Sequence, residues 1–552
     1  MKLWVSLLMS AGLAACAGMP SAGSAKGRAY ADFLIGRFAN LREDHRAASD
    51  RYFTALAASP RDRNLLEGGA RAALAAGDLG RARAIARNAG AQDIPAIRLL
   101  RAAIALQNGQ SSAARAAMDE AGGAVDEQFA ARFIHAWAKA GEGRAAEAAA
   151  DTGLINTPRP FSSLFRYERA LLLDFGGRTE DALTAYAQAE EEGLVLAPAL
   201  LRHADLLVRA GQRPAAAALL QRFTGATQNP EIGAALARIE AGGAVVSHPL
   251  TPARGAAITF YGFGSLLVQE TSDEDDGLVA LWFGLLLDPD LDVARIAVAQ
   301  AQRSIGNFTE ARAALSTLPA ASPYANNAQI MSAWILRDEG KEEEALAAAG
   351  AALRDGGARA QLALADLYRA FSRYGDAEPV YTQLIAGAPD DWRLYFSRGV
   401  CRHQLDQWPA AEADLRRALE LSPEQPDILN YLGYSWIDRG EHLHEGLTML
   451  QRAAELRPQS GAILDSVGWA YYKLGQYDQA LRYLERAVEL EPADAILNEH
   501  LGDGYWRVGR RLEARFQWRR VLTLDPTEEA RAAVTNKLSS GLPNQPLANA
   551  GP

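Results

Sequence analysis

Histidine and acidic side chains gather at two places in the sequence where they could bind a cation. His442 and His444 lie beside Glu441 and Glu445, and this set of nitrogen and oxygen donors could hold a metal ion such as zinc. Residues 271–277, TSDEDDG, offer carboxylates to calcium but lack the ordered ligand spacing of a calcium-binding loop. Both stretches fall where a turn between helices is expected, and turns carry solvated polar residues. The sequence therefore predicts no metal site and no cofactor.

The sequence carries none of the short motifs that mark common catalytic sites. It has no H-E-x-x-H, no phosphate-binding loop, no G-x-S-x-G and no C-x-x-C, and its histidines are scattered. The net charge of −10 argues against general nucleic-acid binding. Cys401 falls inside a predicted helix, which favours a buried structural thiol over a reactive one. We expect a protein that is not an enzyme; the alternative, an enzyme with accessory repeats, leaves no segment for a catalytic domain.

The first residues have the features of a secretory signal. Lys2 precedes an apolar run at residues 3–13, which is too short to span a membrane. The LAAC at residues 13–16 resembles the lipobox of bacterial lipoproteins. That resemblance implies cleavage before Cys16 and lipidation of Cys16. An ordinary signal peptide with a coincidental cysteine is the alternative.

The residue after this cysteine bears on the membrane that would hold the anchor. Lipoproteins of this kind often carry Asp there when they stay in the inner membrane, and here the residue is Ala17. We expect a signal peptide at 1–15, a flexible tether at 16–28, and a lipid anchor on the periplasmic face of the outer membrane.

A 34-residue period organises the C-terminal part of the chain. Prolines recur at this spacing, and so do small and aromatic residues. The matched positions are Pro458, Pro492 and Pro526; Gly468 and Gly502; Ala480 and Ala514; and Tyr471 and Tyr505. A period of this length with such columns is the signature of tetratricopeptide (TPR) repeats, each of which is a pair of helices.

Each repeat shows the pattern of two amphipathic helices joined by a turn. In one repeat Leu464, Val467, Gly468 and Tyr471 follow the i, i+3, i+4, i+7 spacing of one helix face. Gly475 lies where this first helix should end, at the position that tolerates a left-handed backbone. One hairpin cannot bury its apolar face alone, so the repeats must stack. The sequence therefore predicts an all-α fold, a TPR superhelical solenoid.

The repeats extend in weaker form over most of the chain, as about twelve hairpins in all. Residues 242–255 carry two prolines and interrupt the periodicity, so they are predicted as a linker, an elbow between two superhelical segments. We expect a degenerate N-terminal TPR superhelix at 29–241 and a C-terminal TPR superhelix at 256–538, with a capping helix at its end. The last residues, 539–552, are predicted to be a disordered tail.

The first helix of each TPR hairpin is expected to line the concave groove of the stack, with positions beside the core columns facing the groove. Large aromatic side chains on such a face favour a protein-binding groove. Coverage by neighbouring second helices is the alternative. The predicted groove residues are Asn430, Tyr434, Asp465, Trp469, Tyr472, Glu499, Asp503, Trp506 and Arg507.

Several stretches resemble one group of proteins more closely than TPR proteins in general. They are the LAAC lipobox, YGFGSLL at 261–267, ASPYA at 321–325, and the closing LNYLGYSWIDRG, DSVGWAYYKLGQY and EHLGDGYWRVGRR. Together they are similar to large TPR outer-membrane lipoproteins of Gram-negative bacteria, the best understood of which look like adaptors for periplasmic carboxyl-terminal processing proteases. The resemblance implies binding to such a protease and delivery of substrates such as peptidoglycan hydrolases.

We therefore expect a non-catalytic, membrane-anchored scaffold or adaptor in the periplasm. It would bring a carboxyl-terminal processing protease together with cell-wall hydrolase substrates, one partner on each superhelical segment. The alternative is a scaffold for envelope assembly, serving outer-membrane proteins, a secretin or cell-wall machinery. Known TPR scaffolds of that kind are generally much shorter, which counts against this alternative.

Overall fold

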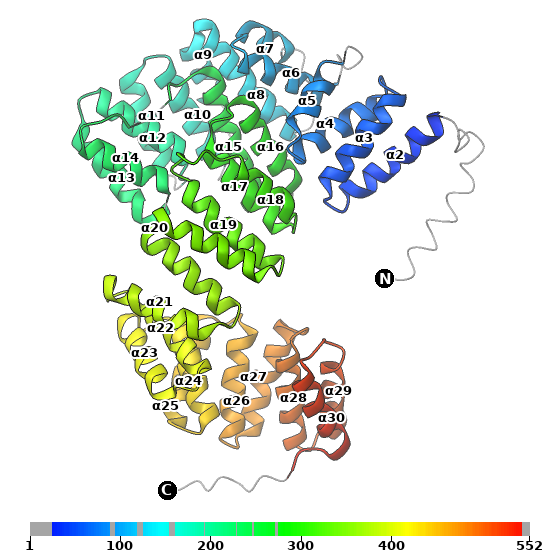
Figure 1. Cartoon of the computed structure of the whole chain (residues 1–552), viewed down its shortest axis with the longest axis vertical. Coiled ribbons are helices and arrows are strands. Elements are labelled where there is room, and N and C mark those ends of the chain that lie inside the picture. Colours follow the sequence, from blue (N-terminus) through cyan, green and yellow to red (C-terminus); the bar gives the residue numbers. More distant parts are fainter. Residues whose placement is uncertain are drawn as a thin grey trace. The chain divides into compact units, whose positions relative to one another are not determined.

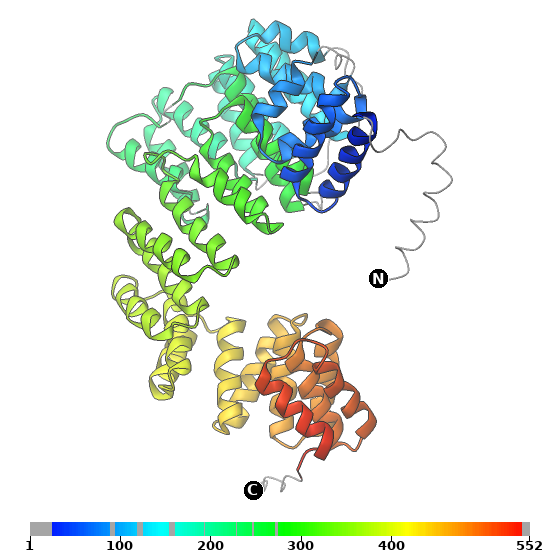
Figure 2. The same cartoon turned by 45° about the vertical axis from the view of Figure 1, so that its right-hand side comes forward.

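Helices joined by short turns make up the part of the chain that the computed structural model describes. That part is residues 25–88, 94–118, 125–153, 161–191, 194–227, 229–245, 248–270 and 274–543. No strand occurs among these residues. Successive helices pair as hairpins, and neighbouring hairpins pack on one another (Figures 1 and 2). The predicted all-α solenoid is confirmed.

The chain divides into two compact units, Met1–Ala352 and Leu353–Pro552, called here the N-terminal and the C-terminal unit. The helices of the N-terminal unit are α2 (Ala25–Asn40), α3 (His45–Ala58), α4 (Arg63–Ala75), α5 (Leu79–Ala86), α6 (Pro95–Gln107), α7 (Ser111–Met118), α8 (Val125–Lys139), the π-turn η3 (Ala140–Arg144), α9 (Ala145–Gly153), α10 (Phe161–Phe175), α11 (Thr179–Glu191), α12 (Ala197–Arg209), α13 (Arg213–Thr227), α14 (Pro230–Glu240), α15 (Pro252–Glu270), α16 (Glu274–Leu287), α17 (Asp292–Ser304), α18 (Phe308–Ser316), α19 (Ala325–Asp338) and the first part of α20 (Glu342–Ala370).

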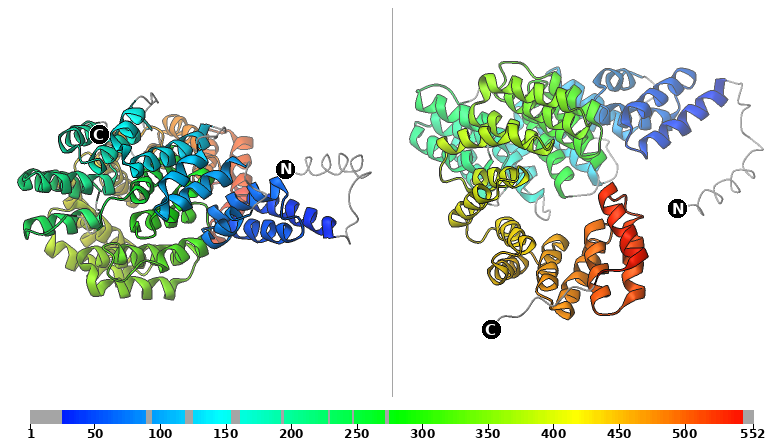
Figure 3. Two further views of the ribbon diagram at one scale, coloured as in Figure 1. Left: turned by 90° about the horizontal axis from the view of Figure 1, so that it is seen from above. Right: turned by 60° about the horizontal axis from the view of Figure 1, so that its bottom comes forward.

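The second part of α20 belongs to the C-terminal unit. Within α20 the backbone leaves helical geometry at Gly357. Its other helices are α21 (Tyr374–Gly387), α22 (Trp392–Gln404), α23 (Trp408–Leu421), α24 (Pro426–Arg439), α25 (Leu443–Leu456), α26 (Gly461–Lys473), α27 (Tyr477–Leu490), α28 (Ala495–Arg507), α29 (Arg511–Val521) and α30 (Glu528–Ser540). Figure 3 shows the same hairpins from two further directions.

The turn inside a hairpin follows from the residue types at the end of its first helix. In α26 the last helical residue is Lys473, and Gly475 takes a left-handed φ of 75°. The amide N–H of Gln476 then donates to the carbonyl oxygen of Tyr471 over 2.9 Å, which satisfies a carbonyl group at the helix end. The helix stop predicted at Gly475 is confirmed.

Close packing inside each hairpin explains the small residues of the 34-residue period. A Cβ atom at Gly468 would stand 2.7 Å from Cγ of Leu484 on the paired helix. Ala480 on that helix is fully buried. Any larger residue at these two positions would push the helices apart, so the repeat keeps them small.

The largest apolar core of the N-terminal unit is organised around the hairpin of α15 and α16. These two helices pack against α4, α6, α8 and α10, the first helices of four earlier hairpins (Figure 1). The sequence of α16 ends in LVALWFGLLL and is apolar on every side, as is usual for a helix surrounded by protein. Residues from α15 and α16 therefore belong to the same buried cluster as residues from α8 and α10.

The boundary between the two units differs from the predicted elbow at 242–255. The N-terminal unit continues through that segment to Ala352. The physical reason is the position of α15 and α16, which follow the segment directly and pack back onto the hairpins that precede it. The two compact units therefore do not coincide with the predicted segments 29–241 and 256–538.

The two ends of the chain bear on the predicted anchor and tail. Cys16, the signal peptide at 1–15 and most of the tether lie outside the described residues, as do residues 544–552 of the predicted tail. The predicted capping helix is confirmed as α30, which runs two residues further than expected, to Ser540. Among the helices that the structure describes, none combines the length and the apolar character that crossing a bilayer requires.

Candidate protein-binding grooves

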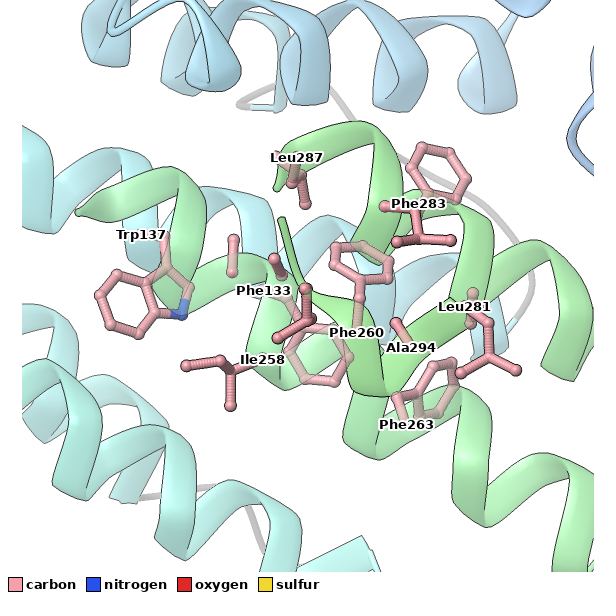
Figure 4. Packing of buried hydrophobic residues seen from close by; sticks show 14 of the residues in the cluster. Phe133, Trp137, Ile258, Phe260, Phe263, Leu281, Phe283, Leu287 and Ala294 are labelled. Atoms are coloured by element: carbon pink, nitrogen blue, oxygen red, sulfur yellow. The ribbon is translucent and has the colours of Figure 1, made fainter. Parts of the chain in front are cut away.

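The inner face of the N-terminal unit, lined by α4, α6, α8 and α10, is occupied by the chain's own α15–α16 hairpin. Phe133 of α8 packs edge-to-face with Phe260 and with Phe263 of α15, at ring-centroid distances of 5.6 and 5.5 Å. All three rings are buried (Figure 4). Such aromatic pairs add to the free energy of burial, so the hairpin is held as part of the core.

Polar contacts fix the same hairpin at both ends. Trp137 of α8 donates its indole N–H to Thr259 Oγ1 over 3.4 Å inside the core. At the start of α16, Asp275 Oδ1 lies 3.1 Å from His45 Nε2, and Asp276 forms an ion pair with Arg71. The acidic stretch at 271–277, predicted as a solvated turn, therefore places two of its carboxylates against α3 and α4. Residues 271–273 of that stretch lie outside the described residues.

This occupancy changes the expectation that each superhelical segment holds one partner. The α15–α16 hairpin occupies the inner face of the N-terminal unit and leaves a pocket of about 170 Å³ against α4, α6 and α8. A client segment as large as a helix therefore cannot bind there without displacing α15 and α16. Sequence reasoning missed this arrangement. The signal that could have found it is the lack of amphipathicity in LVALWFGLLL, because a helix that is apolar all round needs neighbours on every side.

The C-terminal unit carries the nine predicted groove residues on the first helices α24, α26 and α28. Six of them are partly exposed: Asn430, Tyr434, Trp469, Glu499, Trp506 and Arg507. Three are buried: Asp465, Tyr472 and Asp503. The predicted face therefore exists as a strip of side chains, but only part of it is open to a partner.

Trp469 is the centre of the open part of this strip. Its indole stacks on Tyr472 at 4.7 Å with an interplanar angle of 5°, and on His500 at 4.0 Å with an angle of 14°. The Lys473 ammonium lies 5.7 Å from the same ring system. A rigid aromatic surface beside a cation is the kind of anchor on which protein interfaces depend.

His500 is a groove residue that the prediction did not include. Its Nδ1 lies 2.7 Å from Asp465 Oδ2, and its side chain is 12% exposed. Burial acts against the charged imidazolium, but the carboxylate of Asp465, together with Asp503 and Glu499, outweighs burial and raises the pKa of His500. The missed signal was its spacing: His500 stands 35 positions after Asp465, one position off the repeat.

The capping helix α30 closes the far end of the strip. Lys537 Nζ binds Glu499 Oε1 at 2.6 Å and Asp503 Oδ2 at 2.7 Å. The residues after α30 continue this cover, because a Cβ at Gly541 would stand 1.9 Å from Cζ2 of Trp506. Glu499, Asp503 and Trp506 are therefore engaged by the chain's own C-terminal residues.

Arg507 belongs to the same closed end. Its Nε donates to Tyr472 Oη at 2.9 Å, and its Nη1 donates to the carbonyl oxygen of Pro543 at 2.8 Å. The open part of the groove is thus reduced to Asn430, Tyr434 and Trp469, with Asp465 and Tyr472 beneath them.

Three buried polar atoms of the residues around this open part have no hydrogen-bond partner among the described residues. They are Asn430 Oδ1 on α24 and Asp465 Oδ1 and Trp469 Nε1 on α26. A buried polar atom left without a partner costs about 1–3 kcal/mol. Two acceptors and one donor of neighbouring repeats are in this state, on α24 and α26.

The histidine pair that suggested a metal site is engaged differently. The His442 ring packs against Trp436 at a centroid distance of 4.9 Å, and its Nδ1 lies 3.5 Å from Glu445. Among the residues that the structure describes, no three histidine, cysteine or acidic side chains converge in a way that could hold a metal ion.

Comparison with known protein families identifies the repeats. Three family models, each described as tetratricopeptide repeat, match residues 364–430, 404–461 and 462–494. Residues 364–494 are TPR repeats. The open groove around Trp469 lies within this TPR region, as do Asn430 and Asp465.

The chain is also similar to several solved structures at low sequence identity. A TPR protein from Parabacteroides merdae is 18% identical, with a TM-score of 0.38, and the match covers 45% of this chain and 97% of that chain. The Cut9–Hcn1 hetero-tetramer of the APC/C matches with 15% identity and a TM-score of 0.40 over 98% of this chain and 99% of that chain. YrrB, a TPR protein with an unusual peptide-binding site, matches with 18% identity and a TM-score of 0.28 over 34% and 97%. No curated protein matches the chain significantly.

Proposed function

We propose that the protein is a non-catalytic scaffold that holds a protein client in the TPR groove of its C-terminal unit, beside Trp469. TPR repeats are protein-interaction modules. The observation that carries the choice of groove is the set of unpartnered polar atoms, Asn430 Oδ1, Asp465 Oδ1 and Trp469 Nε1, on a partly exposed aromatic surface. The inner face of the N-terminal unit is filled, which supports the same choice.

The chemistry of this groove favours an extended segment of a client chain. Backbone N–H groups of the client would donate to Asn430 and Asp465 as Trp469 and its neighbours adjust. A backbone carbonyl oxygen would accept from Trp469 Nε1. An apolar or aromatic client side chain would then stack on the Trp469 surface and provide most of the affinity. The groove needs no catalytic group for this task, which agrees with a scaffold.

The location and the client are the finer part of the proposal. We propose that Cys16 carries a lipid that anchors the protein on the periplasmic face of the outer membrane. The client is then a carboxyl-terminal processing protease or its cell-wall hydrolase substrate. The lipobox and the motif resemblance support this version. Because the groove of the C-terminal unit takes one segment at a time, a second client needs a surface other than the inner face of the N-terminal unit.

A photo-crosslinker placed at Tyr434 tests the groove in native membranes. The expected result is one dominant crosslinked client, which is lost when Trp469→Ala is added. The matched control is Phe516→Ala on α29, because Phe516 is also aromatic but is 65% exposed and lies outside the groove. If the crosslinked client survives Trp469→Ala, or none forms with the unaltered groove, the groove assignment is wrong.

The identity of the crosslinked client separates the two functions. A processing protease or a peptidoglycan hydrolase supports the adaptor. A β-barrel assembly machine or a secretin instead supports a scaffold for envelope assembly, with the same groove. The anchor is tested separately by metabolic labelling with an alkyne fatty acid: label that disappears in Cys16→Ala supports lipidation, and equal label in both proteins contradicts it.

A further inference from the structure

A second cleft lies entirely within the N-terminal unit, away from the filled inner face. Its cavity volume is about 420 Å³, and it opens between α12, α14, the start of α15 and the loop that joins α18 to α19. Ligand sites of folded proteins fall in this size range. The α18–α19 loop contributes residues of the ASPYA motif, which had no role in the grooves described above.

Three arginines, Arg202, Arg238 and Arg254, are among the residues that line the cleft. The guanidinium of Arg238 donates to the carbonyl oxygens of Ala244 and Val245, at 3.2 and 2.7 Å. Within the described part of the chain it forms no ion pair. Its positive charge therefore has no carboxylate in direct contact, although Glu231 on the same cleft lining is close enough to feel it.

Arg202 supplies a second unsatisfied donor. Its side chain is 9% exposed, and it holds Asp174 through Nη2 at 3.2 Å. Its Nε, however, is buried and has no hydrogen-bond partner among the described residues. Arg254 differs from both, because its Nη1 is paired with Asp288 Oδ2 at 2.9 Å.

The carboxylates on the same lining form no ion pair with Arg238 among the described residues. Glu231 accepts a hydrogen bond from Tyr324 Oη at 3.2 Å, and burial raises the pKa of its carboxyl group. Asp292 is paired with Arg295 at 3.0 Å. The remaining acidic residue, Asp290, is exposed and lies beside the turn between α16 and α17. Glu231 is also close enough to feel the charges of Arg254 and Arg238, but among the described residues no carboxylate is in ion-pair contact with Arg238. Arg238 is therefore the arginine of this lining whose charge an added anion could pair with.

The lining of the cleft also includes apolar side chains. Leu201 of α12, Ile258 of α15 and Leu291 contribute aliphatic side chains. Pro323 and the buried ring of Tyr324 form the wall on the α18–α19 loop. The Tyr324 hydroxyl is tied to Asn229 and Glu231 on the α14 side at 3.1 and 3.2 Å, so this wall is held in place.

We infer that this cleft binds a carboxylate attached to an apolar group, with the carboxylate against Arg238 and Arg202 and the apolar group against Ile258 and Tyr324. Arginine is suited to this task because its fork of N–H donors matches the two carboxylate oxygens. Two sources offer such a group: the free carboxyl end of a peptide with an apolar last residue, and a small aliphatic acid. The site is in the N-terminal unit, so it goes beyond the client groove and does not depend on it.

Calorimetric titration of the full-length chain with three probes tests this inference. The probes are N-acetyl-Ala-Leu with a free carboxyl end, the same dipeptide as its carboxamide, and hexanoate. The expected result is binding of the free acid that is at least tenfold tighter than binding of the carboxamide. If hexanoate binds as tightly as the dipeptide acid, the site is one for small acids. If hexanoate binds more weakly, the site is one for peptide carboxyl ends.

Two variants and one control locate the binding. Arg238→Gln removes the guanidinium that has no ion-pair partner. It is expected to weaken binding of the dipeptide acid at least tenfold. Ala321→Trp fills the cleft from an exposed loop position and is expected to abolish binding with the thermal midpoint unchanged. The control is Arg213→Gln, because Arg213 also donates to carbonyl oxygens near the end of α14, those of Ile239 and Gly243, but does not line the cleft.

The same titrations overturn the inference in either of two ways. If neither the dipeptide acid nor hexanoate binds, the arginines of the cleft hold no carboxylate. Equal loss of binding in Arg238→Gln and Arg213→Gln would show that the effect comes from the α14 end and not from the cleft. Neither result changes the crosslinking outcome expected for the Trp469 groove, so failure of this site and failure of the client groove are distinguishable.

Discussion

Gly255 of α15 lies directly against the indole ring of Trp137 of α8. A Cβ atom at Gly255 would stand 2.1 Å from Cη2 of that ring, closer than any side chain tolerates. Trp137 is fully buried, so the ring has no free space into which to move. The absence of a side chain at Gly255 is therefore a condition for placing α15 inside the N-terminal unit.

Gly255→Ala is expected to destabilise the N-terminal unit by about 1–3 kcal/mol, because the added methyl group overpacks the core. The measurement is the free energy of local opening from hydrogen exchange of α8 and α15. The matched control is Gly233→Ala on α14, where a Cβ meets nothing within 4 Å. That control should be neutral or stabilising by up to about 1 kcal/mol, since alanine favours helix. Equal effects of the two substitutions would contradict the packing of α15 against Trp137.

Glu168 of α10 is expected to make the N-terminal unit less stable as the pH rises. It is buried, its Oε1 has no hydrogen-bond partner, and burial raises its pKa to about 8. Since the unfolded group titrates near its ordinary value of 4.5, the folded state binds the proton more tightly. Stability is therefore full below about pH 4.5 and falls as the pH rises towards 8, by a total on the order of 3–5 kcal/mol.

The substitution that tests this is Glu168→Gln, which keeps the shape and removes the charge. Urea unfolding at pH 5 and pH 8.5 should show a large loss of stability in the natural chain and a much smaller loss in the variant. The control is Glu489→Gln, an exposed residue paired with Arg486, which should leave the pH dependence unchanged. A variant that keeps the full pH dependence would show that other groups are responsible.

The pKa of the His500 ring is expected to lie above its ordinary value because of the neighbouring carboxylate of Asp465. Its pKa is raised although burial alone would lower it. The stability that this pair contributes is fully present below the unfolded pKa of about 6.5 and is lost as the pH rises through the folded pKa. An NMR titration of the His500 ring should show a raised midpoint in the natural chain and a lower midpoint in Asp465→Asn. A natural midpoint below 6.5 would contradict the Asp465 contact.

Cys401 is expected to resist alkylation in the folded protein. The side chain is fully buried and, mainly through desolvation, the pKa of its thiol is raised to about 11. At pH 8 only about one thiol in a thousand is then the reactive thiolate. Mass spectrometry of the Cys401 peptide after brief iodoacetamide treatment should show little label in buffer and full label in denaturant. Equal labelling in both conditions would contradict the burial of this helix face.

The sequence by itself determined the features that depend on near neighbours along the chain. The 34-residue period predicted the hairpins and their stacking, Gly475 predicted a helix end, and the buried thiol of Cys401 followed from its helix-interior position. These predictions succeeded because helix turns, caps and hairpin packing join residues a few to a few tens of positions apart. The predicted groove residues do lie on the first helices α24, α26 and α28, and their binding role stays a prediction.

Only the tertiary structure decided which groove is open. The filling of the inner face depends on contacts such as Phe133 with Phe263, which are 130 positions apart and have no signature in the repeat period. The closure of the Trp506 end depends on Lys537 and Gly541, whose side-chain and backbone positions follow from how α30 docks. An apolar hairpin has the same composition whether it stacks at the end of a solenoid or lies inside one. The sequence period therefore specified the repeats, and long-range packing selected which of their faces a partner can reach.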